Sequence, residues 1–405
     1  MTSTNRLAGR VAAALATSAF VWLASPAMAQ EAYRIGALNP VSGAGNTYGS
    51  GMQKSILAAA EEVNAAGGAA GRRLEVLAED SQTSPEPAVL AAKKLIEVNK
   101  VNAIVGTWSS SVSLAIQPLT KTNSIILMHT SSAPALFTQN ERNLAWGLQS
   151  ASKYNGRAMT AVATREGFKR PAIMAFNNDA ATGNVGFFRS TWEAAGGKIV
   201  TSVVYEPRRT SYRSELQKVL SQNPDVIALS GYLPDTTIIL REAYELGATA
   251  KVLIPGGAAG PQLIAALGPE VAQGVLVYET VPDTEGTAFK RYTEQYNKSF
   301  GSSGADNVFA AQTYDAVITL ALAIEKAGAS ADNVAIAKEI RDVASPDGET
   351  VTSFEEGKKL LKEGRKINYD GASGRLDFDE DGNAISDFAL FAIDNGKYVR
   401  RYVLK

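Results

Sequence analysis

Residues 103–111 read AIVGTWSSS and residues 125–134 read IILMHTSSAP, so each stretch is a short apolar run that passes directly into serine and threonine. This pattern is typical of a buried parallel strand whose carboxyl end opens into the start of a helix. In an open α/β sheet, ligands bind outside the carboxyl ends of the strands, and a helix N-terminus favours a negative group. Two such strand ends predict a neutral cradle of hydroxyls and amides for one carboxylate.

Serine and threonine are also ordinary helix caps, because their side-chain oxygens accept hydrogen bonds from the free N–H groups of a first turn. Either stretch alone fits that plain interpretation. Two of them, at equivalent positions of consecutive strand–helix units, favour a binding site.

The first residues have the features of a targeting segment. Arg6 and Arg10 precede an apolar run at residues 11–24, which passes into the small residues SPAMA. This order is typical of a secretory signal peptide, and the run is shorter than the ~20 residues that a membrane span needs. We predict a signal peptide at residues 1–29, cleaved near Ala29, and a soluble, exported mature chain.

Composition limits the chemistry of the chain. It has 405 residues, a formal net charge of −1, no cysteine and one histidine. After the signal peptide, enough chain remains for two or three domains of ~100–200 residues. The absence of cysteine excludes thiolate metal sites and thiol nucleophiles, and the balanced charge gives no electrostatic reason to expect nucleic acid as a partner. We expect no metal and no cofactor.

Apolar periodicity predicts two series of alternating strands and helices. The first has strands at 33–38 and 74–77 besides the two opening runs, and helices at 52–64 and 87–98. The second has strands at 172–176, 199–205, 226–229, 252–254 and 275–278, with helices at 185–195, 212–221 and 236–246. Residues 287–363 are mostly helical, and strands return at 375–378, 388–393 and 398–404. Because these last strands must join an existing sheet, the chain crosses between two α/β lobes more than once.

A series of short motifs runs through the mature chain. They are IGALNPVSG at 35–43 followed by Tyr48, VNAAGG at 63–68, the two serine-rich strand ends, PDV at 224–226 with SGY at 230–232, and YDGASG at 369–374 with FDEDG at 378–382. Their order and spacing resemble those of the periplasmic binding proteins that serve ABC importers of branched-chain amino acids. The resemblance covers nearly all of the mature chain.

The resemblance implies a type I periplasmic binding protein fold, in which two doubly wound α/β lobes clamp a ligand about a hinge of three crossings. Carried over to this sequence, the N-terminal lobe comprises residues 30–149 and 282–385, and the C-terminal lobe comprises residues 150–281 and 386–405. It also implies a monomeric, non-catalytic carrier in the periplasm that binds a small carboxylate, an amino acid in the first place, and delivers it to a membrane ABC permease.

The resemblance also implies the ligand contacts. In the family, the ligand carboxylate is held at positions that match Ser110 and Ser132, and a backbone carbonyl near Ser131 accepts from the ammonium. Trp108 lines the pocket, and Tyr232 closes over the ligand from the second lobe. The full set of predicted ligand-binding residues is Tyr48, Trp108, Ser109, Ser110, Ser131, Ser132, Thr182, Tyr232 and Gly257.

Two positions depart from the family pattern. Gly257 stands at or next to the position where amino-acid-binding members have a carboxylate for the ligand ammonium, and Thr182 replaces an aromatic residue. Asp179 or Glu279 could supply the missing charge from another direction. An ammonium buried without a counter-charge is costly, so a carboxylate without an amine, such as an aromatic or short aliphatic acid, stays open as the alternative ligand.

Other functions fit the sequence less well. His129 lies near serines, but the G-x-S-x-G elbow of α/β hydrolases is absent there, so we expect it to border the pocket or pack beside it. Residues 377–383 copy half of a calcium loop, yet Phe388 stands where a bidentate glutamate is needed, which favours a turn. The same fold serves as the extracellular part of receptors. Because the sequence ends on a strand at Lys405, we expect a free carrier rather than such a sensor.

Overall fold

The computed structural model describes Met1 and residues 31–140, 142–282, 284–305, 307 and 309–404. The predicted signal peptide, apart from Met1, lies outside the described residues. None of the described helices is long and apolar enough to cross a membrane.

The first sheet is parallel and brings the two serine-rich stretches together. Its order is β2-β1-β3-β4-β5, and the pairing of Gly106 with His129 places the last residues of β3 and β4 side by side. Both strands are buried along their whole length, which explains their unbroken apolar runs. The strands are β1 (Tyr33–Asn39), β2 (Leu74–Asp80), β3 (Ala103–Gly106), β4 (Ile126–His129) and β5 (Ala145–Gly147), and the helices that follow them are α1 (Asn46–Ala65), α2 (Pro85–Lys93), α3 (Ser110–Thr122) and α4 (Ala135–Thr138).

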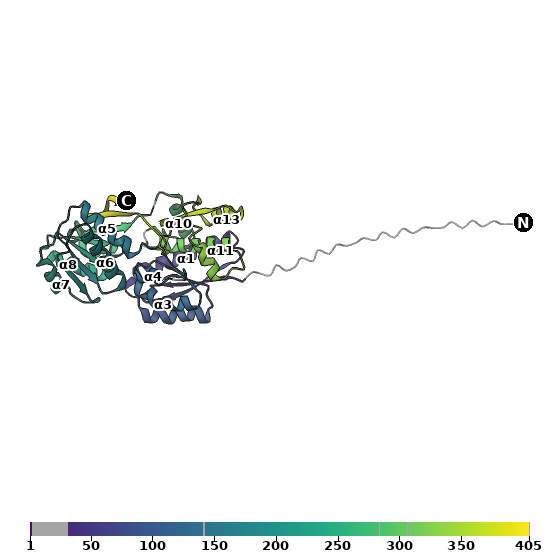
Figure 1. Cartoon of the computed structure of the whole chain (residues 1–405), viewed down its shortest axis with the longest axis horizontal. Coiled ribbons are helices and arrows are strands. Elements are labelled where there is room, and N and C mark those ends of the chain that lie inside the picture. Colours follow the sequence, from purple (N-terminus) through teal and green to yellow (C-terminus); the bar gives the residue numbers. More distant parts are fainter. Residues whose placement is uncertain (2–30, 141, 283, 306, 308, 405) are drawn as a thin grey trace. The chain divides into compact units, whose positions relative to one another are not determined.

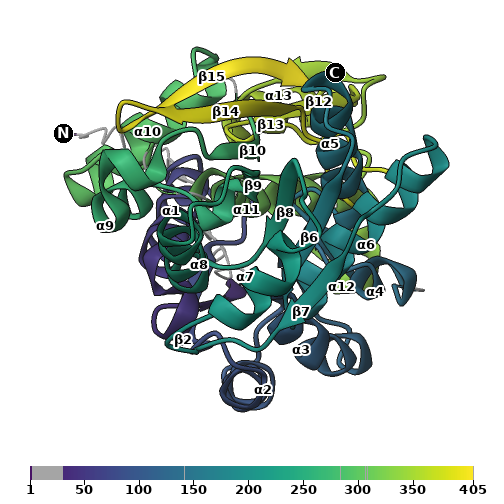
Figure 2. The same cartoon turned by 90° about the vertical axis from the view of Figure 1, so that its left-hand side faces the viewer.

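The second sheet has seven strands in the order β15-β14-β10-β9-β8-β6-β7, which Figure 2 shows from the yellow edge strand β15 to β7. Neighbours from β10 to β7 are parallel, and β14 and β15 add to β10 in antiparallel fashion. Its strands are β6 (Pro171–Phe176), β7 (Ser202–Tyr205), β8 (Val226–Ser230), β9 (Lys251–Pro255), β10 (Leu276–Thr280), β14 (Phe388–Asp394) and β15 (Lys397–Leu404), and its helices are α5 (Ser152–Arg165), α6 (Asp179–Ala194), α7 (Arg213–Leu220), α8 (Leu233–Glu245) and α9 (Pro261–Ala272).

Each sheet has its own hydrophobic core, so the predicted fold class of two α/β lobes is confirmed. In Figure 1 the helices α5 to α8 gather around one sheet, and α1, α3 and α4 gather with the later α11 and α13 around the other. The later helices are α10 (Thr287–Phe300), α11 (Ala310–Ala327), α12 (Asn333–Glu339) and α13 (Phe354–Lys362). The exact lobe boundaries stay a prediction.

A third, small sheet corrects the predicted tail. It consists of β11 (Glu349–Val351), β12 (Ile367–Gly371) and β13 (Gly374–Arg375). The sequence did not predict β12, and the strand predicted at 375–378 is wrong beyond Arg375. Phe378 makes a single bridge with Ala384, because the chain turns between them.

The connections between the two sheets are tied to one another. The backbone of Gly147 forms a bridge with Asn383, and the Asn383 side chain accepts from Ala151 N at 2.8 Å and donates to Gln149 O at 2.7 Å. Nearby, Val281 N donates to Asp387 O at 3.0 Å. Segments far apart in the sequence therefore run side by side where the chain passes between the sheets.

Candidate ligand-binding site

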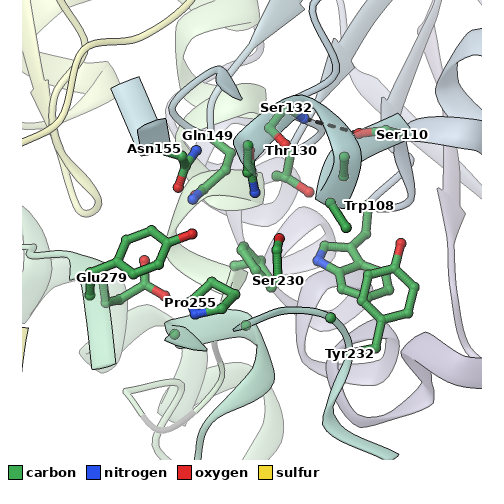
Figure 3. A pocket seen from close by; sticks show the side chains of 18 residues that line it. Trp108, Ser110, Thr130, Ser132, Gln149, Asn155, Ser230, Tyr232, Pro255 and Glu279 are labelled. Atoms are coloured by element: carbon green, nitrogen blue, oxygen red, sulfur yellow. Dashed lines mark hydrogen bonds between the residues drawn. The ribbon is translucent and has the colours of Figure 1, made fainter. Parts of the chain in front are cut away.

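A small cavity lies where the carboxyl ends of strands from both sheets meet. Its volume is about 80 Å³. The loops after β3 and β4 supply one side, and the ends of β8, β9 and β10 supply the other (Figure 3). Residues from α5 and α6 also line it. The side chains that line it include those of Trp108, Ser110, Thr130, Ser132, Gln149, Asn155, Asn184, Tyr232, Tyr278, Glu279 and Phe309.

The predicted hydroxyl pair lies on the cavity wall. Ser110 begins α3, and its Oγ accepts from the backbone N–H groups of Ser132 and Ala133, each at 3.2 Å. The Ser110 hydroxyl therefore links the end of β3 to the end of β4. Glycine is required at Gly106, where φ is +119° and a Cβ would lie 2.5 Å from Asn39 Oδ1. This turn directs residues 107–110 across the strand end.

Ser131 and Ser109 contact the site indirectly. The buried Ser131 hydroxyl donates to Thr107 O at 2.6 Å and so joins the two loops behind the cavity. Ser109 is the N-cap residue of α3 and a hydrogen-bond partner of the Tyr232 side chain. Burial raises the pKa of Tyr232 to about 12. Both serines position other groups and do not line the cavity.

Aromatic rings form a wall that joins the two sheets. Trp108 packs between Tyr48 and Tyr232, with ring centroids 4.9 Å and 4.6 Å away, and Phe309 lies 5.9 Å from Trp108. Tyr48 is behind Trp108 rather than on the cavity surface, and its hydroxyl donates to the carbonyl of Gly257. Such ring pairs contribute about 0.5–1.5 kcal/mol each beyond the area they bury.

The two positions that depart from the family pattern have different surroundings. Gly257 lines the cavity, whereas Thr182 does not. The Thr182 hydroxyl donates at 2.6 Å to the backbone oxygen of Asn178, the N-cap residue of its own helix, which leaves it no free donor for a ligand.

Of the two acids that could supply the missing charge, only Glu279 reaches the cavity. Asp179 accepts from Ser111 Oγ at 2.7 Å and lies outside the cavity lining. Glu279 Oε1 accepts from Thr280 N at 2.6 Å and Thr280 Oγ1 at 2.8 Å. Among the described residues that line the cavity, Glu279 is the only one with a charged side chain.

Several lining residues escaped the sequence analysis. Thr130 is part of the second serine-rich stretch, so the signal was present but not used. Asn155 and Asn184 lie within the helices α5 and α6, where nothing in the sequence marks the inward face as a binding surface. Phe309 precedes α11 with a φ of +67°, an unusual conformation for a large side chain.

His129 packs beside the site and does not line it. It is fully buried, its Nδ1 accepts from Ser131 N at 3.2 Å, and its ring centroid is 5.5 Å from that of Phe137. Burial lowers the pKa of His129 to about 4, so the imidazole is neutral in the folded protein.

The acidic loop at 377–383 forms a turn. Asp379 Oδ1 accepts from the backbone N–H groups of Asp381 and Asn383, and Lys153 forms ion pairs with Asp379 at 2.9 Å and Asp381 at 2.7 Å. The part of the chain that the structure describes contains no cluster of acidic, histidine or cysteine side chains suited to a metal ion.

Comparisons with known proteins agree with this architecture. The Leu/Ile/Val-binding protein of Rhizobium johnstonii is 24% identical over 386 residues, which cover 93% of this chain and 96% of the relative. The leucine-, isoleucine-, valine-, threonine- and alanine-binding protein of Pseudomonas aeruginosa is 26% identical over 85% of this chain and 91% of its own length. The crystal structure of a leucine-binding protein, LivK, from Thermotoga maritima superposes with a TM-score of 0.78 at 27% identity, covering 92% of this chain and 98% of that one.

The family model described as periplasmic binding protein matches residues 32–397, nearly the whole span over which the two sheets and the cavity are built. The resemblance seen in the sequence motifs is thereby confirmed, and this chain belongs to the periplasmic binding protein family.

Proposed function

We propose that this chain is the solute-binding component of an ABC importer, which captures an amino acid of the branched-chain or a related type in the periplasm and delivers it to a membrane permease. It acts as a monomer, without catalysis, by closing the lobes 30–149 with 282–385 and 150–281 with 386–405 around the ligand. A signal peptide at residues 1–29 directs its export. The names of the relatives, which are amino-acid-binding proteins, support this ligand class.

The observation that carries the proposal is the hydroxyl pair of Ser110 and Ser132 at the ends of two adjacent parallel strands. Hydroxyls and backbone N–H groups at such strand ends can hold a ligand carboxylate through charge-assisted hydrogen bonds. Trp108 and Tyr232 supply an apolar wall, as is usual in small-molecule sites. None of these groups has to transfer a proton or form a covalent bond.

The predicted contact residues divide into three groups in this proposal. Direct contacts come from Trp108, Ser110, Ser132, Tyr232 and the backbone of Gly257. Positioning comes from Tyr48, Ser109 and Ser131, which hold the first group in place. Thr182 takes no part, because its hydroxyl donates to the backbone oxygen of Asn178 at the start of α6.

The size of the cavity favours a small solute. A volume of about 80 Å³ is well below the ~300–1,000 Å³ of pockets for drug-sized ligands. A single amino acid is therefore a better match than a peptide or a larger conjugate.

A thermal-shift screen of amino acids and amine-free acids tests the proposal. Ligand at ~100 times its dissociation constant adds about 2.7 kcal/mol of stability, enough for a clear rise in melting temperature. We expect at least one amino acid to stabilise the protein, and Ser132→Ala to weaken its binding by about 1–3 kcal/mol in calorimetry. The exposed Ser302 gives the control variant Ser302→Ala, which should bind like wild type. If only amine-free acids stabilise the protein, the proposed ligand class is wrong and the alternative, a carboxylate without an amine, is correct.

A further inference from the structure

Glu279 gives the cavity a negative charge opposite the hydroxyl pair. It is the penultimate residue of β10, and Figure 3 shows it beside Pro255, across the cavity from Ser110 and Trp108. Its Oε1 is held by Thr280, whereas no hydrogen bond or ion pair engages Oε2 among the described residues. No lysine or arginine of the described chain lines the cavity.

Two adjacent glycines create the room that this arrangement needs. A Cβ at Gly256 would lie 1.7 Å from Glu279 Oε2, so any side chain at 256 would displace the carboxylate. A Cβ at Gly257 would lie 3.2 Å from Phe309 Cζ, so an acidic side chain there would press against the aromatic wall. The loop after β9 thus carries no carboxylate at Gly256 or Gly257, and the space that these glycines leave is occupied by the carboxylate of Glu279 from β10.

Three polar atoms of other described residues that line the cavity also lack partners. Tyr278 Oη, Asn184 Oδ1 and Thr130 Oγ1 make no hydrogen bond within the described structure. Tyr278 is 1% exposed, Thr130 3% and Asn184 8%, and all three residues line the cavity. Because an unsatisfied buried polar group is costly, these atoms point to a ligand that offers hydrogen bonds.

We propose that Glu279, with Asn184 Oδ1 and Tyr278 Oη, forms an ammonium subsite, in which the counter-charge comes from β10 instead of the loop after β9. The inference rests on the proposed function and names the residues that recognise the ammonium group of its amino acid ligand. The ligand carboxylate lies at Ser110 and Ser132, and its ammonium donates to Glu279.

Charge balance supports this assignment. A carboxylate without an amine would lie in a small cavity with the carboxyl group of Glu279, the only acidic or basic side chain among the described residues that line it, and two carboxylates disfavour each other there. Burial also raises the pKa of Glu279, which a bound cation would oppose. A zwitterion leaves the cavity with one net negative charge instead of two.

Matched ligand pairs that differ only in the amine test the subsite. Calorimetry on the mature protein would compare leucine with 4-methylpentanoate, phenylalanine with 3-phenylpropanoate, and alanine with propanoate. In wild type we expect the amino acid of the best-bound pair to be favoured by roughly 10- to 100-fold, since a buried charged partner contributes on this scale. Glu279→Gln, which keeps the shape of the side chain, should reduce that preference to about threefold or less.

A second variant separates charge from position. Gly256→Ala keeps the carboxylate of Glu279 but displaces it, so this variant should also lose the preference for the amino acid over its amine-free partner. The exposed Glu193 on α6 provides the control Glu193→Gln, which should behave as wild type. Circular dichroism confirms that each variant is folded.

The possible results distinguish the two proposals. If Glu279→Gln keeps the full preference for amines, the subsite is wrong while the amino acid function stands. If wild type binds only amine-free acids, or none of the pairs, the proposed function fails together with the subsite that rests on it.

Discussion

Removing the hydroxyl of Ser110 should destabilise the protein even without ligand. Its Oγ accepts from two backbone N–H groups, those of Ser132 and Ala133, and Ala133 is only 1% exposed. Leaving a buried donor unpaired costs about 1–3 kcal/mol, and the higher helix propensity of alanine offsets only a few tenths of a kcal/mol of that loss. Both bonds are 3.2 Å long, at the weak end of the normal range. We therefore expect Ser110→Ala to lower the free energy of unfolding by about 1–3 kcal/mol.

Ser132→Ala is the matched control for this prediction. The Ser132 hydroxyl lines the cavity, and no protein group within the described structure hydrogen-bonds to it, so its removal should change ligand-free stability by less than about 0.5 kcal/mol. The two serines therefore differ in that only the Ser110 hydroxyl accepts backbone hydrogen bonds within the described structure. Urea unfolding of dialysed protein, followed by circular dichroism, measures both values. Equal stability losses, or a Ser110→Ala variant as stable as wild type, would refute the reasoning.

Two further predictions concern protonation and closure. The His129 pKa of about 4 lies below the 6.5 of an unfolded chain, so the unfolded state binds more protons between these values. The free energy of unfolding should therefore lose nothing to His129 above pH 6.5 and should fall by up to about 3 kcal/mol as the pH is lowered towards 4. Urea unfolding at a series of pH values measures this decline, which should be smaller in His129→Gln. Ligand contacts with both lobes should drive closure about the crossings near Gln149, Val281 and Ile385. Small-angle scattering should show a smaller radius of gyration with saturating ligand, and an unchanged radius would contradict a clamshell motion.

The parts of the fold that could be predicted are those that local pattern determines. The strands β3 and β4 are fully buried, so their sequences are unbroken apolar runs with polar residues directly after them. Strand β12 escaped prediction because its sequence, INYDG, is short and half polar. Its place depends on a distant residue, since the buried Asp315 of α11 accepts from Tyr369 Oη at 2.8 Å and Ala372 N at 2.9 Å.

The site could be predicted only where the chain supplies it from strand ends. Trp108, Ser110 and Ser132 follow strands directly, and they line the cavity. Asn155 and Asn184 enter it from the sides of helices, and only the packing of those helices decides which face is inward. Sequence reasoning offered Asp179 and Glu279 as equal candidates for the counter-charge. The structure distinguishes the two acids, because the register of β10 brings Glu279 to the cavity whereas Asp179 accepts a hydrogen bond from Ser111.

The aromatic wall also allows the opening of the cavity to be followed by intrinsic tryptophan fluorescence. Trp108 is stacked against Tyr232 from the other sheet, whereas the remaining described tryptophans, Trp146 and Trp192, are buried within separate cores. Any movement that separates the sheets exposes the Trp108 indole to water and leaves the other two unchanged. The emission spectrum of the unlabelled protein should therefore follow the opening of the cavity in real time, against a constant background from the two cores.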